Sequence, residues 1–506
     1  MTDSTIGIVG AGIMGRGIAQ VAAEAGMGVR IADAAPGKAA EAAEACAAMI
    51  RRKVDKGQAE PAAAAAAIAR ITATDAGPQA GYGAFAGCDL VVEAVVERLE
   101  VKQQVLAGLE AAVGEDCILA TNTSSLSVTA LAAGARRPGR VAGFHFFNPV
   151  PLMRVVEVIG GALTDEAVVE RLIAIARRMG HQPVRATDTP GFVVNHAGRG
   201  YLTEALRIVS EGIAAFADVD RVMTQAAGFR LGPFELLDLT GLDVSVPVMD
   251  AIYHQYYEEP RYRPSVLAAT RQAGGLLGRK SGRGFYDYPG GKIARPQEPP
   301  PPGPPAGQTA WISPVDAAAK AALGSILVAA GAELETGPKP SPEAIAFVTP
   351  WGDDCGTAAL AEGLDPRQVV AVDPSTLGPR LTLMASPATD PAVRRAAHGL
   401  LAAGGAAMTL INDSPGFIAQ RIHAAIVNVG SDMAQQRVAA PEEIDLAVEL
   451  GLGYPRGPLR LGDAMGPARV LHILERMGAF YADPRYRPSP WLKRRARLGL
   501  SLQAPD

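Results

Sequence analysis

The stretch Gly10-Ala11-Gly12-Ile13-Met14-Gly15 follows the apolar run 6–9 and opens an alanine-rich segment. A short apolar run before a GxGxxG string and a helical pattern after it predict the strand–turn–helix unit of a dinucleotide-binding domain. The first glycine permits the tight turn, the second lets the backbone approach a pyrophosphate, and the third lets the helix pack on the strand. The helix start offers free N–H groups to the phosphates. We therefore predict that NAD contacts Gly10, Gly12, Ile13, Met14 and Gly15.

An acidic residue supports this reading of the glycine loop. Asp33 lies eighteen residues beyond Gly15, directly after the apolar run 29–32. A carboxylate at that place accepts hydrogen bonds from the ribose hydroxyls and repels a 2′-phosphate, which favours NAD over NADP. A glycine-rich turn without a ligand is the alternative, and it would not require the acid.

The pattern around this loop changes near residue 188. Residues 5–187 alternate short apolar runs with amphipathic stretches, which predicts a Rossmann-type, doubly wound α/β domain over 1–187, with a parallel or mostly parallel sheet. Long helical stretches follow and predict an all-α domain over 188–287. A run with seven prolines between 296 and 305 then predicts a semi-rigid linker, to which we assign 288–309.

The second half of the chain contains a copy of the helical segment. The string DTPGF at 188–192 matches DSPGF at 413–417, an offset of 225. The same offset relates Asp220 to Asp445, Gly228 to Gly453, Gly232-Pro233 to Gly457-Pro458, Asp238 to Asp463 and Gly241 to Gly466. With one residue of slippage, PRYRPS occurs at both 260–265 and 484–489. We therefore predict a second all-α domain at 413–506, preceded at 310–412 by a degenerate Rossmann-like domain without a cofactor motif.

The composition excludes several classes of function. A net charge of −4 over 506 residues provides no basic surface for nucleic acid. The four cysteines are far apart and have no CxxC or other metal spacing, so we expect neither disulfides nor a metal site, and a reducing compartment. No apolar run is long enough to cross a membrane, and the first residues do not resemble a signal peptide. These features predict a cytoplasmic protein that binds neither membranes nor nucleic acid.

A histidine and a glutamate are the strongest catalytic candidates. His145 lies in the apolar run FHFFNP at 144–149, and Glu157 follows twelve residues later in the strand-like run 155–159. A carboxylate that fixes the tautomer and orientation of an imidazole makes it a suitable proton acceptor for alcohol oxidation. A histidine in an apolar segment is by itself more often a core residue, but here a dinucleotide site precedes it.

Together these motifs resemble the L-3-hydroxyacyl-CoA dehydrogenase family, which oxidises the (S)-3-hydroxyl of acyl-CoA thioesters with NAD in β-oxidation. The resemblance covers 5–287 and rests on the glycine loop, NTSSL at 122–126, FHFFNP, VEV at 156–158 and DTPGF with Asn195. Residues 413–506 resemble the helical domain of the same family. The tandem arrangement resembles the bacterial members of phenylacetate degradation, which implies 3-hydroxyadipyl-CoA as a substrate.

The resemblance also implies roles for single residues. His145 falls on the catalytic base and Glu157 on its carboxylate partner. Ser124 falls on the serine that binds the substrate oxygen, and Asn195 on the asparagine that closes the site. Asn148 would position neighbouring groups of the substrate site. On the cofactor side, the resemblance assigns Glu97, Lys102 and Asn122 to NAD.

Several of these residues have simpler explanations. Ser124 and Asn195 could cap helices, and Lys102 could be a solvated surface residue. Two other functions stay open: a dehydrogenase of a sugar acid or other hydroxy acid, and a non-enzymatic, crystallin-like NAD-binding protein.

The second helical copy has Gln420 where the first has Asn195, and no histidine–glutamate pair precedes it. We therefore expect one active site per chain. Single-copy members of the family dimerise through the helical domain, so the tandem copies are expected to form an intrachain pseudo-dimer. A homodimer of the whole chain stays open in addition.

Overall fold

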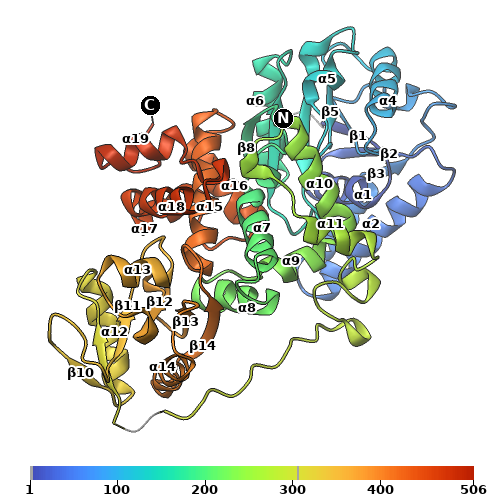
Figure 1. Cartoon of the computed structure of the whole chain (residues 1–506). Coiled ribbons are helices and arrows are strands. Elements are labelled where there is room, and N and C mark those ends of the chain that lie inside the picture. Colours follow the sequence, from blue (N-terminus) through green and yellow to red (C-terminus); the bar gives the residue numbers. More distant parts are fainter. Residues whose placement is uncertain (1–3, 305–306, 506) are drawn as a thin grey trace. The chain divides into compact units, whose positions relative to one another are not determined.

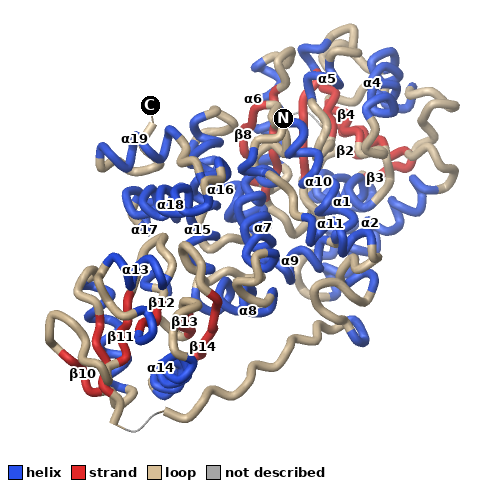
Figure 2. The backbone as a smooth tube through the Cα atoms, in the orientation of Figure 1, coloured by secondary structure: helices blue, strands red, loops and turns tan. Residues whose placement is uncertain are grey.

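The computed structural model describes residues 4–304 and 307–505 and separates into two compact units. One unit consists of Met1–His196 and Gln436–Leu452, and the other of Ala197–Gln435 and Gly453–Asp506. Each unit contains one sheet, as the two groups of strands show (Figures 1 and 2).

The first sheet has eight strands in the order β3-β2-β1-β4-β5-β6-β7-β8. All neighbours are parallel except β6 and β7. The strands are β1 (Thr5–Val9), β2 (Gly28–Ala32), β3 (Ile71–Ala73), β4 (Leu90–Glu93), β5 (Ile118–Thr121), β6 (Val141–Phe146), β7 (Val155–Gly160) and β8 (Gln182–Thr187). The helices are α1 (Ile13–Glu24), α2 (Lys38–Asp55), α3 (Pro61–Ala69), α4 (Leu99–Ala112), α5 (Val128–Ala132) and α6 (Glu166–Arg178).

Both faces of this sheet are buried, as expected for a doubly wound fold. The consecutive residues Ile8 and Val9 of β1 belong to two different hydrophobic clusters, because successive side chains of a strand point to opposite faces. Helices on both faces bury the two clusters and explain why the strands are continuously apolar. The predicted Rossmann-type sheet is confirmed.

A helix from the far end of the chain completes this first unit. Helix α16 (Pro441–Leu452) packs against β7 and β8. The approach is close, because a Cβ added at Gly451 would lie 2.9 Å from a methyl carbon of Val194. Just before α16, the carbonyl of Val438 accepts a hydrogen bond from the N–H of Thr187 at 2.9 Å.

The second sheet has six strands in the order β10-β9-β11-β12-β13-β14, of which only β12 and β13 are antiparallel. The strands are β9 (Thr309–Ile312), β10 (Glu333–Glu335), β11 (Ile345–Val348), β12 (Val369–Val372), β13 (Arg380–Ala385) and β14 (Ala407–Asn412). The helices between them are α12 (Ala317–Ala329), α13 (Cys355–Ala361) and α14 (Pro391–Ala403). This sheet has two strands fewer than the first.

The remaining helices of the second unit come from both copies of the repeat. The first copy contributes α7 (Val194–Ser210), α8 (Phe216–Arg221), α9 (Pro233–Thr240), α10 (Leu242–Gln255) and α11 (Val266–Ala273), with a π-helical turn at Val222–Ala226. Helix α7 begins in the first unit, to which Val194 to His196 belong. The second copy contributes α15 (Ile418–Gln435), α17 (Pro458–Met465), α18 (Pro467–Tyr481) and α19 (Pro490–Leu498).

The two copies of PRYRPS meet each other inside the second unit. The Arg261 side chain donates to the carbonyl of Arg487 at 3.0 Å, and the Arg485 side chain donates to the carbonyl of Arg263 at 2.8 Å. These two bonds are reciprocal. In each, the first arginine of one PRYRPS copy donates to the carbonyl of the second arginine of the other copy. The repeated segments therefore contact one another through equivalent groups.

The proline-rich segment is held to the second unit rather than free. Between Pro296 and Pro304 it contains neither helix nor strand (Figure 1). Glu298 accepts from the Arg380 side chain at 2.6 Å and pairs with Arg221 at 3.0 Å. Further along, a Cβ added at Gly399 in α14 would lie 2.6 Å from the carbonyl oxygen of Gly303. Among residues 4–304 and 307–505, no helix is both long and apolar enough to cross a membrane.

Candidate active site

The glycine loop between β1 and α1 has the geometry that a dinucleotide requires. Gly10 has a φ of +104°, and a Cβ at Gly15 would lie 1.8 Å from the Gly10 carbonyl oxygen, so neither position accepts a side chain. At Gly12, in contrast, a Cβ would have no atom within 4 Å. Gly12 begins α1 without a side-chain cap, which leaves the helix N–H groups open to an anion. These residues fit the pyrophosphate of NAD.

Asp33 lies directly after β2 and is tied to the same loop. One carboxylate oxygen accepts from the N–H of Ala11 at 2.7 Å, and the other accepts from the N–H of Ala35 at 2.9 Å. Each carboxylate oxygen has a second lone pair for a ribose hydroxyl. The ribose contact of Asp33 stays a prediction.

Glu97 and Lys102 form a connected charge cluster with a residue that the motifs did not single out. Glu93, at the end of β4, accepts from Lys102 Nζ at 2.9 and 3.0 Å, and both side chains are almost fully buried. Glu97 lies in the loop beyond β4, not at the strand end, and its carboxylate is 3.3 Å from the same ammonium. Lys102 is therefore not a solvated surface residue, contrary to one sequence-based alternative.

Glu97 is held in its charged form. Burial opposes ionisation, but the Lys102 ammonium and hydrogen bonds from Thr123, Ser124 and Ser125 outweigh it and lower the pKa of Glu97. The Thr123 hydroxyl donates at 2.6 Å and the Ser124 N–H at 3.0 Å. Glu97 thereby joins the loop after β4 to the loop after β5. The carboxyl ends of neighbouring parallel strands are the place where open α/β sheets bind ligands.

Asn122 and Ser124 follow β5 at this edge of the sheet. The side-chain oxygen of Asn122 accepts from the N–H of Phe146 at 2.8 Å, so Asn122 fixes the end of β6 next to His145. Ser124 is partly exposed and does not cap α5, because Ser127 is the N-cap residue and accepts from the N–H of Ala130. The helix-cap alternative for Ser124 is therefore wrong.

His145 and Glu157 are partners across the antiparallel strands β6 and β7. The strand register places them directly opposite each other, and His145 Nδ1 lies 2.5 Å from Glu157 Oε2. Both side chains are buried, with relative exposures of 4% and 0%. Nδ1 must carry the proton to donate to the carboxylate, which leaves Nε2 as the acceptor. Within the described residues Nε2 has no hydrogen-bond partner.

The other oxygen of Glu157 is held by the start of the first long helix. Oε1 accepts from the N–H groups of Val193 and Val194 at 2.9 and 2.8 Å. Gly191 and Phe192, with φ of +77° and +47°, form the turn that precedes these two groups. The ring centroids of Phe192 and Phe147 lie 5.8 and 4.5 Å, respectively, from the centroid of the His145 ring. The imidazole is therefore fixed by one charged partner and two aromatic rings.

The two asparagines of the predicted substrate site occupy different surroundings. Asn195 is the second residue of α7 and is partly buried. Asn148 is exposed and lines a small cavity of about 200 Å³ with Ile13, Arg16 and Met49. The structure thus brings His145 and Glu157 together directly, and joins Asn122 to the strand that carries His145.

The residue that sequence reasoning missed is Glu93. Its signal was an acid in the otherwise apolar run 90–95, which a buried strand tolerates only when the charge is paired. The partner lies nine residues away on α4, so the pair becomes visible only in the folded structure.

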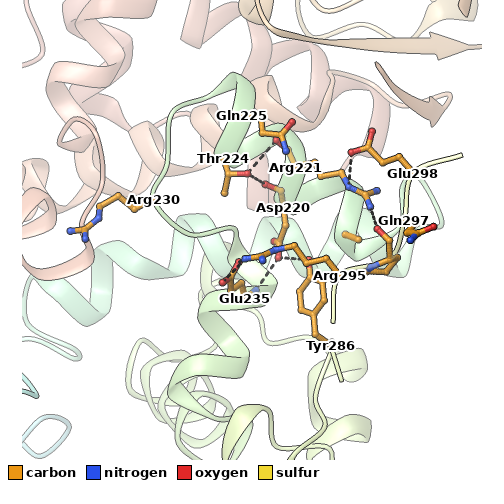
Figure 3. A pocket seen from close by; sticks show the side chains of 12 residues that line it. Asp220, Arg221, Thr224, Gln225, Arg230, Glu235, Tyr286, Arg295, Gln297 and Glu298 are labelled. Atoms are coloured by element: carbon orange, nitrogen blue, oxygen red, sulfur yellow. Dashed lines mark hydrogen bonds and ion pairs between the residues drawn. The ribbon is translucent and has the colours of Figure 1, made fainter. Parts of the chain in front are cut away.

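A larger polar cavity lies elsewhere, in the second unit. It has a volume of about 670 Å³ and is lined by side chains that pair with one another (Figure 3). Arg295 bonds Glu235 at 2.8 Å, Arg221 pairs with Glu298, and Asp220 accepts from the first N–H groups of α9. These charges are satisfied by one another and hold the helices and the linker in place.

Models of known protein families match most of the chain. Residues 5–189 match the family model described as "3-hydroxyacyl-CoA dehydrogenase, NAD binding domain". Residues 191–288 and 416–504 both match the model "3-hydroxyacyl-CoA dehydrogenase, C-terminal domain". The sequence is 35% identical to a 3-hydroxyadipyl-CoA dehydrogenase of Escherichia coli over 98% of both chains. It is 39% identical to human mitochondrial hydroxyacyl-coenzyme A dehydrogenase over 56% of this chain and 90% of the human one.

Solved structures agree with these similarities. A 3-hydroxybutyryl-CoA dehydrogenase from Escherichia coli K12 matches with a TM-score of 0.85 and 33% identity, covering 98% of this chain and 99% of that one. An (S)-3-hydroxybutyryl-CoA dehydrogenase from Ralstonia eutropha matches with a TM-score of 0.55 and 37% identity, covering 57% of this chain and all of the other. The first match thus includes the second sheet and the second helical copy.

Proposed function

This chain belongs to the 3-hydroxyacyl-CoA dehydrogenase family, and from that premise we propose that it oxidises a (S)-3-hydroxyacyl-CoA to the 3-oxoacyl-CoA, reversibly, with NAD. The observation that carries this proposal is the buried pair of His145 and Glu157 at 2.5 Å, on the sheet that also carries the glycine loop. A crystallin-like binding protein would not need an imidazole nitrogen without a hydrogen-bond partner beside a fixed carboxylate.

His145 is the general base in this reaction. Its Nε2 accepts the proton of the 3-hydroxyl, and the positive charge that develops on the ring is stabilised by Glu157, whose orientation is fixed by two backbone N–H groups. NAD, held by the glycine loop and Asp33, would supply the hydride acceptor for C3. Ser124 hydrogen-bonds the substrate oxygen, and Asn195 and Asn148 position the substrate.

On the cofactor side, the residues divide between the two halves of the dinucleotide. Gly10, Gly12, Ile13, Met14 and Gly15 hold the pyrophosphate at the start of α1, and Asp33 binds the adenosine ribose. Glu97, Lys102 and Asn122 line the nicotinamide side, where the Lys102 ammonium offsets part of the negative charge of Glu97 and Glu93.

The decisive experiment measures the loss of NADH absorbance with acetoacetyl-CoA, with free acetoacetate and with gulonate-derived substrates. We expect turnover with the thioester only. Turnover of a sugar acid without any turnover of a thioester would support the alternative dehydrogenase and contradict the proposal. Absence of turnover with every substrate despite NADH binding would favour the non-enzymatic reading.

We also propose 3-hydroxyadipyl-CoA as the preferred substrate, because the Escherichia coli relative with that name matches over the full length of this chain. The measurement compares kcat/KM for 3-hydroxyadipyl-CoA and 3-hydroxybutyryl-CoA. A higher value for the shorter monocarboxylic thioester would contradict it.

We further propose the division into domains at 1–187, 188–287, 288–309, 310–412 and 413–506, with the two helical copies as an intrachain pseudo-dimer. Support comes from contacts inside the second unit. Buried Arg421 of α15 pairs with buried Glu204 of α7 at 2.7 Å, and a Cβ at Gly200 of α7 would lie 2.9 Å from the Ala425 carbonyl oxygen.

Light scattering tests the pseudo-dimer. A chain whose helical copies cover each other is expected to elute at its own mass of 52.4 kDa. Removal of 310–506 is expected to give an aggregating or dimeric protein, and a stable, active monomer would contradict the proposal. The cytoplasmic location predicted from the scattered cysteines stays a prediction, and fractionation of cells tests it.

A further inference from the structure

The second sheet repeats the register of the first at the place where the first carries its catalytic pair. Strand β13 pairs with β14 from Arg380–Ala407 to Ala385–Asn412, which is the β7–β8 pairing shifted by 225 residues. Thr382 therefore takes the place of Glu157. Strand β12 runs antiparallel to β13, as β6 does to β7. Directly after β12, the N–H of Asp373 donates to the carbonyl of Thr382 at 3.1 Å, so Asp373 takes the place of His145.

These replacements remove the imidazole–carboxylate pair from this place in the second sheet. Asp373 is fully buried and accepts from Gln420 Nε2 at 2.9 Å and from the Ser375 N–H at the same distance. Gln420 is the residue at the repeat position of Asn195, and it also donates to the carbonyl of Pro350. A polar cluster centred on Asp373, in which one carboxylate oxygen has no hydrogen-bond partner among the described residues, thus replaces the imidazole.

The space beside this cluster has nevertheless stayed open. A cavity of about 650 Å³ is lined by the loop after β12, by α12 and by helices of the second copy. The volume lies within the range of about 300–1,000 Å³ that metabolite-sized ligands occupy. The side chains that define its chemistry are Trp351, Thr376, Leu377, His423, Arg456 and Arg469.

Positive charge prevails in this cavity. Arg456 and Arg469 are exposed at its walls, and the Arg469 guanidinium stacks on Trp351 at 4.2 Å from the ring centroid. Of the described residues, Asp316 is the one acid in the lining, and it is occupied, since it caps α12 at 3.0 Å and accepts from the Trp351 indole N–H at 2.9 Å. Asp316 contributes one negative charge, which acts on Arg469, against the two positive charges of the arginines, so the lining keeps a net positive charge.

A buried imidazole in the lining lacks a partner. His423 is only 8% exposed, and among the described residues its Nε2 has no hydrogen-bond partner. Burial lowers the pKa of His423 to about 4, so the ring is neutral at physiological pH and can donate or accept one hydrogen bond. Buried polar atoms of this kind are normally satisfied.

We propose that this cavity binds a small organic carboxylate with an apolar or aromatic body. Arg456 and Arg469 pair with the carboxylate, because the planar guanidinium matches it through two parallel hydrogen bonds. Leu377, Leu461 and Met465 surround the apolar body. The second sheet has thus exchanged a catalytic site for a binding site, independently of which acyl-CoA the enzyme oxidises.

Trp351 provides a local signal for the test. The chain has three tryptophans, and Trp311 and Trp491 are both buried outside this cavity. Benzoate and hexanoate are titrated against the full-length protein while tryptophan fluorescence is followed, with benzyl alcohol and 1-hexanol as uncharged controls. Saturable quenching by the acids and none by the alcohols is expected.

Variants locate the binding. Arg456→Gln combined with Arg469→Gln is expected to weaken binding of both acids at least tenfold by calorimetry, whereas Arg497→Gln, an exposed arginine of α19, leaves it unchanged. Trp351→Phe removes the fluorescence change but not the calorimetric signal. The absence of saturable binding of either acid, or equal affinity in the double variant and the wild type, would overturn the proposal.

Discussion

The two sheets share one backbone plan and differ at a few side chains. In the first, His145 and Glu157 face each other across an antiparallel step, and in the second Asp373 and Thr382 hold the same positions. The backbone pairing is the same because strand hydrogen bonds use main-chain atoms only. Chemistry therefore depends on two residue types that the fold itself does not require.

The structural acids of the repeat have been kept where the catalytic residues were lost. Asp188 accepts from the N–H groups of Val128 and Thr129 at the start of α5. Asp413 does the same for Cys355 and Gly356 at the start of α13. A carboxylate at a helix N-terminus stabilises the fold whether or not the sheet carries a site. The comparison separates residues that support the fold from residues that perform the reaction.

The largest expected effect comes from removing the base. His145→Gln should lower kcat by a factor of about 10²–10⁴, the usual contribution of a positioned general base. NADH affinity, measured by fluorescence titration, should not change. The matched control is Asp373→Asn, which should retain wild-type turnover. Wild-type kcat in His145→Gln would remove this histidine from the mechanism.

Glu157→Gln should lower kcat by about 10²-fold or more, because the amide would present an N–H₂ group to Nδ1 and favour the wrong imidazole tautomer. The backbone bonds to Val193 and Val194 can persist through the amide oxygen, so the melting temperature should fall little. Steady-state kinetics and thermal unfolding measure the two effects. A large loss of stability with unchanged kcat would make Glu157 a structural residue.

Asp33→Ala tests the cofactor loop, which has no counterpart in the second sheet. Loss of a charged hydrogen bond, worth about 1.5–3 kcal/mol, should raise the Kd for NADH at least tenfold and reduce the discrimination against NADPH. Calorimetry with both cofactors measures this. An unchanged preference for NADH would show that the ribose is bound elsewhere.

The smallest effect is expected at the position equivalent to Glu157. Thr382 is fully buried, and within the described residues its hydroxyl has no hydrogen-bond partner. Thr382→Val should therefore leave turnover unchanged and raise the free energy of unfolding by up to about 1 kcal/mol, because an unsatisfied polar group is removed. Denaturant unfolding measures it. A marked destabilisation would show that the second sheet still depends on this hydroxyl.

Much of the fold and the site could be predicted because the signals are local. The glycine loop, the acid after the next strand and the alternation of apolar runs are short patterns along the chain, and the repeat is recognised from short matching strings at an offset of 225 residues. The pairing of His145 with Glu157 was predictable from two neighbouring strands. Glu93 with Lys102 was not predicted, since the burial that makes their pairing necessary depends on α4 packing against β4.

The sequence by itself determined the order of the elements, the dinucleotide motif and the duplication. The tertiary structure decided which copy supplies which helix. Helix α16 of the second copy covers β7 and β8, and the carbonyl of Val438 accepts from Thr187. In the second unit the carbonyl of Ile213 accepts from the N–H of Asn412, which is the equivalent bond with the two copies exchanged. Such an exchange cannot be read from periodicity, because equivalent apolar faces fit either sheet and only the path of the connecting chain selects one.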